Sequence, residues 1–386
     1  MAQESVSTKM DEPKKTFKGK KLRVAIIGCG GIAQAHLTAY KDIPEVEIVA
    51  GVDIVADRLA VMRDKWGVPE DCLFGADLKT GKEISKTAWR EMLKKMGDKI
   101  DAVDVCTPNG WHCQPVVDCC KAGKHAMTEK PMAMNVAECK KMIAAAKAAG
   151  VKLSVGFQHR YRPACQALIE ARNNGVFGDI LFVKVRALRR RGIPNWGVFG
   201  QKKLQGGGPM IDIGVHMIEA AYEFMGSPKP VAVSANTWTY LGDREDKTHV
   251  RSPWPGWDWK TYTVEDLAIG QVRFANGSIM QIEAAFAAHV KEEVHEFSAL
   301  GTKGGCHFPS GTIYTDQNNT MVNITPAFLG AEDWNTLFRK KLQNWVNGCL
   351  KGTELDASGE DGINVQRILN GVYDSAAAGG KEVPIK

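Results

Sequence analysis

Short apolar runs alternate with helical patterns and glycine turns from Leu22 onward. Each run has the length of one buried strand, and the segment after it repeats its apolar positions at helical spacing. Strands that alternate with covering helices predict a doubly wound parallel sheet over residues 21–150. The expected strands are residues 22–27, 47–52, 102–106 and 125–128, and the expected helices cover about 32–39, 55–66, 89–96, 114–122 and 135–149.

The pattern changes beyond Val151, where the apolar runs become longer and alternate with polar residues. Leu181, Val183, Val185 and Ala187 share one face of such a run, which is the period of a strand with one buried side. The dipeptide Asn276-Gly277 between two similar runs is a strong hairpin signal. We therefore expect an α/β chain whose second domain, residues 151–386, is α+β with a large, mostly antiparallel sheet. Its helices are expected near residues 163–174, 212–225, 335–350 and 362–378.

Composition indicates an ordinary globular protein, with 44% hydrophobic and 24% charged residues. The net charge of +6 includes six lysines between residues 9 and 21, so it does not indicate a nucleic-acid surface. No apolar run approaches the roughly 20 residues of a membrane span. Residues 1–20 are polar and are expected to form a disordered tail rather than a signal peptide, which makes the cytoplasm the expected location. We expect neither nucleic acid nor a membrane as a partner.

A glycine turn after the first expected strand fits a dinucleotide-binding fingerprint. Gly28, Gly30 and Ala33 form G-x-G-x-x-A between a strand and a helix, where the backbone can approach a pyrophosphate. Asp53 follows the second strand about 20 residues later and is suited to bind the ribose hydroxyls of NAD. Its charge would repel the 2′-phosphate of NADP, although Arg58 could turn toward such a phosphate. The cofactor expected is NAD.

Candidate chemistry for the substrate lies in two further segments. Lys130 follows the strand 125–128, and strand ends of this kind carry ligands in parallel sheets. Asp212 and His216 stand four residues apart after three glycines, so they share a face if a helix begins near Ile211. Histidine can take a hydroxyl proton and lysine can stabilise an alkoxide. A capped helix with a structural histidine is an equally simple interpretation, and a zinc site would need a third ligand that is not apparent, so no metal is expected.

Five motifs together resemble the Gfo/Idh/MocA family of oxidoreductases, in order and spacing from Leu22 to the C-terminus. They are Gly28-Cys29-Gly30-Gly31-Ile32-Ala33, Thr107-Pro108-Asn109-Gly110-Trp111-His112, Glu129-Lys130-Pro131, Gly156-Phe157-Gln158-His159-Arg160-Tyr161-Arg162-Pro163 and Asp212-Ile213-Gly214-Val215-His216. The resemblance implies a Rossmann domain followed by an open-faced sheet domain, with the active site between them. It also implies an NAD-dependent enzyme and subunits paired as a homodimer or homotetramer.

The resemblance also implies roles for individual residues. Lys130 matches the active-site lysine, His216 the proton-transferring acid/base, and Asp212 the residue that orients both. Glu219 stands where the family often has aspartate, which retains the carboxylate. Together with the fingerprint, the expected cofactor-binding residues are Gly28, Gly30, Gly31, Ile32, Ala33, Asp53, Arg58, Thr107, Pro108, Asn109, His112, Glu129, Lys130 and Arg160. The expected substrate-binding residues are Lys130, Arg160, Tyr161, Arg189, Trp196, Asp212 and His216.

Three functions remain open from the sequence. The first is a dehydrogenase that moves a hydride between NAD and a secondary hydroxyl of a sugar, a glycoside (for example at its 3-position) or a cyclitol. The second is a redox-neutral enzyme, a glycosidase or epimerase, that holds NAD tightly and passes through a transient keto-sugar. The third is a non-catalytic dinucleotide sensor, for which we would expect the set of Lys130, Asp212 and His216 to be incomplete.

Overall fold

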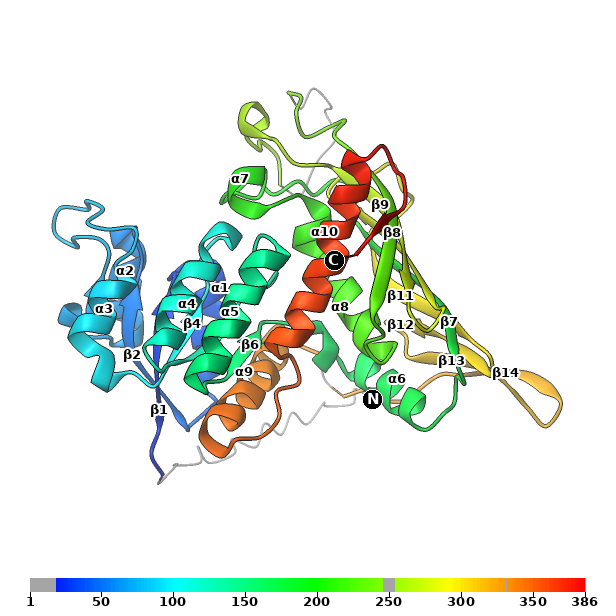
Figure 1. The fold of residues 1–386 in the computed structure, drawn as a ribbon, viewed down its shortest axis with the longest axis horizontal. Coiled ribbons are helices and arrows are strands. Elements are labelled where there is room, and N and C mark those ends of the chain that lie inside the picture. Colours follow the sequence, from blue (N-terminus) through cyan, green and yellow to red (C-terminus); the bar gives the residue numbers. More distant parts are fainter. Residues whose placement is uncertain (1–18, 246–253, 331, 386) are drawn as a thin grey trace, which may run out of the picture.

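Residues 19–245, 254–330 and 332–385 are described by the structure, a computed structural model. The expected tail of residues 1–20 falls almost entirely outside them. Figure 1 shows two sheets at opposite sides of the molecule with helices between them. This arrangement confirms the expected α/β class, a parallel Rossmann sheet followed by a larger, mostly antiparallel sheet.

The first sheet has six parallel strands in the order β3-β2-β1-β4-β5-β6. The strands are β1 (Leu22–Ile27), β2 (Val46–Val52), β3 (Leu73–Phe74), β4 (Ala102–Val105), β5 (His125–Thr128) and β6 (Leu153–Val155). Their helices are α1 (Gly31–Tyr40), α2 (Ala56–Trp66), α3 (Trp89–Met96), α4 (Cys113–Lys121) and α5 (Val136–Ala149). Strand β6 pairs with β5 in parallel register, so this sheet continues beyond residue 150 into the segment expected to belong to the second domain.

Local signals in the sequence set the ends of these helices. The Asn135 side chain accepts a hydrogen bond from the backbone N–H of Glu138 and starts α5. Gly150 ends α5 with φ +64°, and Gly67 ends α2 with φ +69°. Both values lie in the left-handed region, where glycine carries no side-chain penalty. These turns return the chain to the sheet within a few residues.

The second sheet has nine strands in the order β14-β13-β12-β11-β7-β10-β9-β8-β15. All its pairs are antiparallel except the one between β7 and β10, which is parallel. The strands are β7 (Ile180–Leu188), β8 (Pro230–Trp238), β9 (Leu267–Phe274), β10 (Ile279–Ala285), β11 (Val294–Gly301), β12 (Gly304–Phe308), β13 (Thr312–Gln317), β14 (Thr320–Ile324) and β15 (Val383–Pro384). The hairpin expected at Asn276-Gly277 connects β9 to β10.

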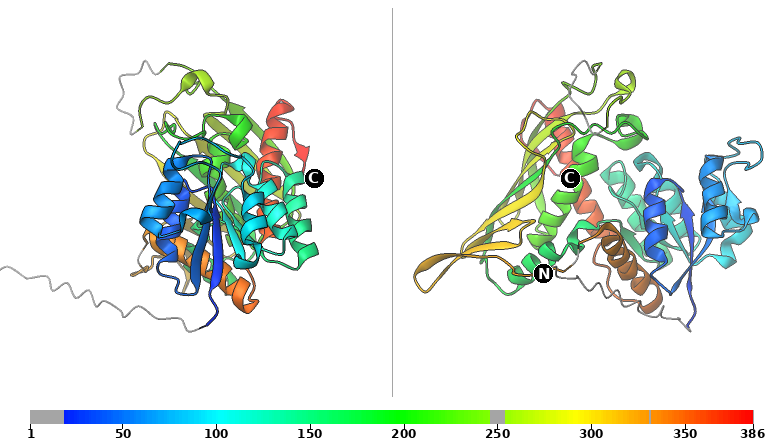
Figure 2. Two further views of the ribbon diagram at one scale, coloured as in Figure 1. Left: turned by 90° about the vertical axis from the view of Figure 1, so that its left-hand side faces the viewer. Right: turned by 180° about the vertical axis from the view of Figure 1, so that it is seen from behind.

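Helices cover one face of the second sheet and leave the other face open among the described residues (Figure 2). Val183, Val185 and Ala187 of β7 are buried beneath the helices, as their alternation predicted. Leu181, expected on the same face, is exposed; beside it the ladder with β11 shifts register, between Leu300 and Gly301. The covering helices are α6 (Pro163–Asn173), α8 (Val215–Phe224) and α10 (Gly359–Ala377).

Helix α9 (Trp334–Lys351) follows strand β14 of the second sheet in the chain but packs on α1 of the first domain. Phe338, Leu342, Trp345 and Val346 are buried in one cluster with Leu37 of α1. The first domain is therefore completed by a helix from near the end of the chain. No helix among the described residues combines the length and the apolar composition needed to cross a bilayer.

Replacing Leu342 by alanine should weaken the packing of α9 on α1 and lower the stability of the protein. Leu342 is fully buried, so the change leaves a cavity, and we expect a loss of about 2–5 kcal/mol in the apparent free energy of unfolding in urea. Lys340→Ala, an exposed change on the same helix, should stay within about 0.5 kcal/mol of the wild type. Equal losses for the two variants would contradict the packing of α9 on α1.

Candidate active site

The turn between β1 and α1 brings bare backbone to the edge of the first sheet. Gly28 has φ +88°, and a Cβ there would lie 2.7 Å from the backbone nitrogen of Thr107 at the end of β4. A Cβ on Gly31, by contrast, would meet nothing within 4 Å. No side chain caps the N-terminus of α1, so its first N–H groups remain available to an anion. The fingerprint residues thus form an open turn of backbone beside the start of α1, a geometry that suits a phosphate group.

Asp53 is buried beside this turn and helps to shape it. Its Oδ2 accepts the backbone N–H of Cys29 at 2.8 Å, and its Oδ1 accepts that of Val55 at 2.9 Å. A carboxylate offers about four acceptor sites, so two remain for ribose hydroxyls. Arg58 lies 3.5 Å from Oδ2 and is half exposed. Its guanidinium is therefore already placed against the carboxylate.

The segment that begins at Thr107 links both domains at this edge. It starts with a short helical turn, η3 (Asn109–Trp111), which follows Pro108. The Asn109 side-chain nitrogen donates to the carbonyl of Gln205 in the second domain at 2.9 Å. The ring of His112 contacts the carbonyls of Thr107 and Pro131 at 2.8 and 2.9 Å. His112 thus holds the loops that follow β4 and β5 together.

Lys130 reaches across from the first domain to the second. Its Nζ donates to the main-chain oxygen of Asp212 at 2.7 Å and to Oδ1 of the same residue at 3.1 Å. Both side chains are half-buried. Asp212 lies in a π-helical turn, η5 (Met210–Gly214), and His216 lies in the first turn of α8, which follows directly. The predicted set of Lys130, Asp212 and His216 is thus brought together.

The three glycines before this turn are needed for close packing. A Cβ on Gly207 would lie 2.0 Å from the hydroxyl of Tyr373, and one on Gly208 would lie 2.3 Å from the carbonyl of Glu265. The Glu265 carboxylate in turn accepts the backbone N–H groups of Gly208 and Met210, at 2.9 and 3.3 Å. The approach of Lys130 to Asp212 therefore depends on a tightly packed and hydrogen-bonded backbone.

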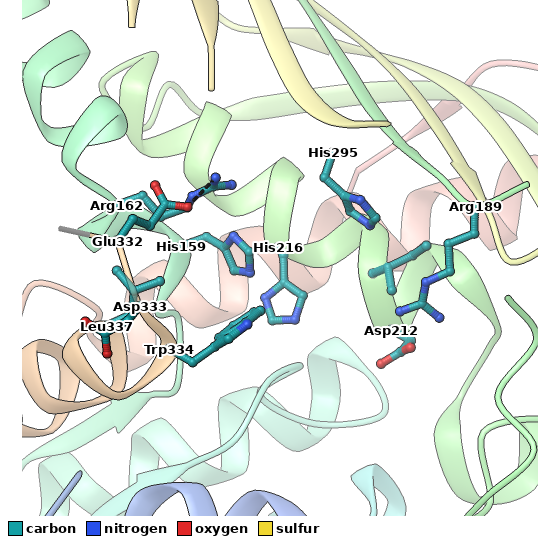
Figure 3. Close-up of a pocket in the computed structure, with 11 residues that line it drawn as sticks. His159, Arg162, Arg189, Asp212, His216, His295, Glu332, Asp333, Trp334 and Leu337 are labelled. Atoms are coloured by element: carbon teal, nitrogen blue, oxygen red, sulfur yellow. Dashed lines mark ion pairs between the residues drawn. The ribbon is translucent and has the colours of Figure 1, made fainter. Parts of the chain in front are cut away.

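A cavity of about 400 Å³ opens beside Asp212 and His216 (Figure 3). Three histidines line it, His159, His216 and His295, and Arg162, Arg189 and Trp334 complete much of the wall. Cavities of this size commonly hold small molecules. Polar donors with one broad aromatic face suit a polyhydroxylated ligand, since hydroxyls need partners and a sugar ring presents an apolar face.

His216 is held in its neutral form. Burial, and next the positive charge of Lys130, keep the pKa of His216 well below its ordinary value. Its Nδ1 is buried without a hydrogen-bond partner among the described residues. A neutral imidazole at the cavity wall can accept a proton at physiological pH.

Glu129, expected to line the cofactor, faces a buried charged network instead. Its Oε1 lies 2.5 Å from Lys341 Nζ of α9 and 3.0 Å from His36 Nε2 of α1. Burial opposes the charge of Glu129, but Lys341 and His36 outweigh it and hold the pKa of this carboxyl far below its usual range. The Nδ1 of His36 lies 2.7 Å from Asp104, so the grouping of His36, Asp104 and Cys106 is already joined by hydrogen bonds and contacts within the protein.

Four residues expected to bind the substrate are absent from the cavity wall, namely Lys130, whose Nζ is bound to Asp212, and three others. Arg160 is buried in an ion pair with Glu219, to which its Nε donates at 2.6 Å. The Tyr161 hydroxyl donates to Asp356 at 2.8 Å. Trp196 is 48% exposed and meets Trp254 edge to face. Of the residues that the sequence suggested for a sugar, Arg189 does line the cavity, with its guanidinium over the ring of Trp254.

Sequence reasoning missed eight of the eleven residues of the wall, and four of these carry an aromatic ring or a guanidinium. His159 and Arg162 stand in the motif 156–163, whose pattern drew attention to Arg160 and Tyr161 instead. Their position on either side of those residues was an available signal. His295 on β11 and Trp334 on α9 carry no motif, and only the fold brings them to this cavity.

Comparisons with known proteins cover nearly the whole chain. The profile described as "Oxidoreductase family, NAD-binding Rossmann fold" (GFO_IDH_MocA) matches residues 22–157, and that of the family's C-terminal alpha/beta domain matches residues 169–385. The D-glucoside 3-dehydrogenase of Escherichia coli (strain K12) is 32% identical over 95% of this chain and 98% of its own length.

Solved structures show the same architecture. Aldose-aldose oxidoreductase from Caulobacter crescentus, complexed with glycerol, has a TM-score of 0.73 at 25% identity over 95% of this chain and all of its own. Levoglucosan dehydrogenase in complex with NADH and levoglucosan has a TM-score of 0.78 at 23% identity, with coverage of 95% and 100%.

Replacing Lys341 by methionine should strongly destabilise the fold, because Glu129 would keep a buried charge without its ammonium partner. We expect a loss of roughly 3–5 kcal/mol in unfolding free energy at pH 7. Since the folded pKa of Glu129 is lowered, the stabilisation it gains is present above about pH 4.3 and is lost as the pH falls. The difference between variant and wild type should therefore shrink in acid.

The double variant Lys341→Met/Glu129→Gln provides the control for this network. It removes both charges of the pair and should recover part of the lost stability. Lys340→Met, on the exposed side of the same helix, should be nearly neutral. A double variant no more stable than Lys341→Met would mean that the charge left on Glu129 is not the cause.

Proposed function

The chain belongs to the Gfo/Idh/MocA oxidoreductases, and on this premise we propose that it is an NAD-dependent dehydrogenase that oxidises a secondary ring hydroxyl of a glucoside or a closely related sugar. The observation that carries the proposal is the hydrogen bond from Lys130 to Asp212, which lines a polar cavity together with neutral His216. The intact set also argues against a purely sensory protein.

The residues present fit NAD. The open glycine turn at Gly28–Gly31 and the uncapped start of α1 suit its pyrophosphate, and Asp53 retains acceptor sites for its ribose. Thr107, Pro108, Asn109 and His112 line the same edge and would border the nicotinamide half. When bound, NAD supplies the acceptor for the hydride of the substrate carbon.

The protein's own residues then handle the hydroxyl proton. His216 takes that proton on a ring nitrogen as the C–H hydride leaves, so the carbon becomes a carbonyl. Lys130 donates to the same oxygen and stabilises the negative charge that develops there. Asp212 holds the Lys130 ammonium in place through the 3.1 Å contact. Arg189 and Trp334 in the wall would bind the remaining hydroxyls and one ring face.

A glucoside is favoured as substrate because the relative that shares 32% identity over nearly its full length is named for oxidation at glucoside position 3. The redox-neutral alternative has support of its own, since the aldose-aldose oxidoreductase of similar fold is named for passing reducing equivalents between two sugars. Release of NADH in proportion to the ketone formed separates the two.

The direct test mixes the purified protein with NAD and a panel of methyl glucosides, other glycosides and inositols. We expect NADH to accumulate together with a product two mass units lighter for at least one glucoside. His216→Ala should lower kcat by roughly 10² to 10⁴ while leaving NAD affinity near normal. Full activity of this variant would exclude His216 as the base. The absence of NADH with every sugar of the panel would overturn the proposal.

The pH profile follows from the lowered pKa of His216. The base is active when neutral, so kcat/KM for oxidation should fall as the pH drops and the imidazole gains a proton. Burial and the charge of Lys130 lower the pKa of His216. The decrease in kcat/KM that is caused by protonation of His216 should therefore occur below about pH 6.5, the ordinary pKa of histidine.

Asp53 should determine the preference for NAD over NADP. Its carboxylate would repel a 2′-phosphate, whereas serine at this position carries no charge. Asp53→Ser should narrow the ratio of kcat/KM for the two cofactors by at least about tenfold, measured with one sugar under identical conditions. The same change made at exposed Asp57 of α2 is the matched control and should leave the ratio unchanged. Comparable efficiency of the wild type with both cofactors would refute this role.

A further inference from the structure

Two imidazole rings lie side by side at the centre of the cavity, and each has a buried nitrogen without a partner. The centroids of His159 and His216 are 4.5 Å apart, with the ring planes inclined by 43° (Figure 3). Among the described residues, neither His159 Nδ1 nor His216 Nδ1 has a hydrogen-bond partner. A buried polar atom without a partner is costly, so two such atoms on adjacent rings require an explanation.

The surroundings keep both rings neutral. Burial and the charge of Arg162 lower the pKa of His159 to about 3, and burial and Lys130 lower that of His216. The other groups acting on the two rings are His295 of β11 and Lys341 of α9, which also disfavour a second proton. Each ring therefore carries one N–H and one lone pair, and the choice of nitrogen is open.

The obvious alternative partner for His216 is the carboxylate of Glu219, which is paired with Arg160. Glu219 lies one turn later on α8 and also has an unpaired oxygen, Oε2. Its other oxygen is held by the Arg160 guanidinium at 2.5 and 2.6 Å. The charges that act most on Glu219 are those of Arg160 and Glu223, and His216 is not among them. No hydrogen bond joins His216 Nδ1 to Glu219 among the described residues, whereas the ring of His159 lies directly against that of His216.

We propose that His159 is a positioning residue for His216: the Nδ1–H of His216 donates to the Nδ1 lone pair of His159, which leaves the His216 Nε2 lone pair free to accept the substrate proton. The inference rests on the proposed function. One hydrogen bond between these adjacent rings, whose centroids are 4.5 Å apart, then satisfies both buried nitrogens. Without His159, the proton of His216 would reside on Nε2 and the base would be blocked.

The same bond serves the step that follows. When the hydroxyl proton moves to His216 Nε2, the ring becomes cationic and its Nδ1–H becomes a stronger donor to neutral His159. The hydride leaves to NAD⁺ in the same reaction, so the electrons and the proton of the alcohol are both accounted for. His159 touches neither the reacting carbon nor the proton in this scheme, and it acts through the tautomer of its neighbour.

A matched pair of substitutions tests the proposal, because asparagine places an acceptor near the position of Nδ1 and glutamine near that of Nε2. His159→Asn should keep kcat for sugar oxidation within about threefold of the wild type. His159→Gln should lower kcat roughly 10- to 100-fold with little change in KM for the sugar or for NAD. Equal kcat values for the two variants would overturn the proposal, since both replace the ring but only one retains the acceptor.

Nuclear magnetic resonance of ¹⁵N-histidine-labelled protein gives a second readout that does not depend on turnover. We expect His216, assigned by the loss of its signals in His216→Asn, to carry its proton on Nδ1 in the wild type and in His159→Asn, and on Nε2 in His159→Gln. A wild-type His216 protonated on Nε2 would refute the hydrogen bond. Full activity of His216→Ala would refute His216 as the base and with it the proposed function. Equal kcat values for the two His159 variants, with His216→Ala inactive, would refute only the hydrogen bond between His159 and His216.

Discussion

The contact between Lys130 and Asp212 fixes where the two domains of this protein can work together. Lys130 is held at the edge of the first sheet, directly after β5, and Asp212 is held in a π-helical turn of the second domain. Their distances of 2.7 and 3.1 Å leave little freedom to either residue. A half-buried charge needs such a partner, because removing it from water without one is costly. His216 follows Asp212 by one helical turn and so faces the same space.

The position of Lys130 depends on charges buried behind it. Glu129 precedes it in the chain and is anchored by Lys341 of α9 and His36 of α1. There is no room for a side chain at Gly156, where a Cβ would lie 2.4 Å from the Glu129 carboxylate. The support beneath Lys130 therefore includes a helix that the chain supplies only after eight of the nine strands of the second sheet. This explains why α9 packs on the first domain rather than on the sheet that precedes it.

The fold could be predicted from the sequence because the signals for its strands and helices lie within short segments of the chain. Periodicity gave the strands, and Asn135, Gly67 and Gly150 marked helix ends that the structure reproduces. Sequence reasoning also selected Lys130, Asp212 and His216 as candidates because each follows a strand end or a glycine turn, and the structure joins Lys130 to Asp212 and places Asp212 and His216 in one cavity wall. It could not foresee that α9 crosses to the first domain, because its apolar face fits either partner and only the tertiary arrangement decides.

The sequence also does not predict the direction in which each side chain of a motif points. The motif around Arg160 suggested a residue near the cofactor, yet Arg160 turns toward Glu219, and its neighbour His159 faces the cavity. Adjacent residues in a short helical turn point in different directions, so a motif identifies the segment without identifying the side chain that serves the site. Likewise, the basic partner of Glu129 cannot be predicted from the sequence, because Lys341 stands more than two hundred positions away from it in the chain.

The distribution of charge around the cavity explains why one residue can be a cation and its neighbour a neutral base. Asp212 offsets the charge of Lys130, whereas His216 has no carboxylate of its own and lies among positive groups. In the proposed oxidation, His216 gains a positive charge at the moment when hydride transfer removes one from the nicotinamide ring. The total charge of the site then stays constant. The positive groups around His216 keep its imidazole neutral before the reaction. When the proton and the hydride move in concert, these groups therefore face no increase in the net positive charge of the site.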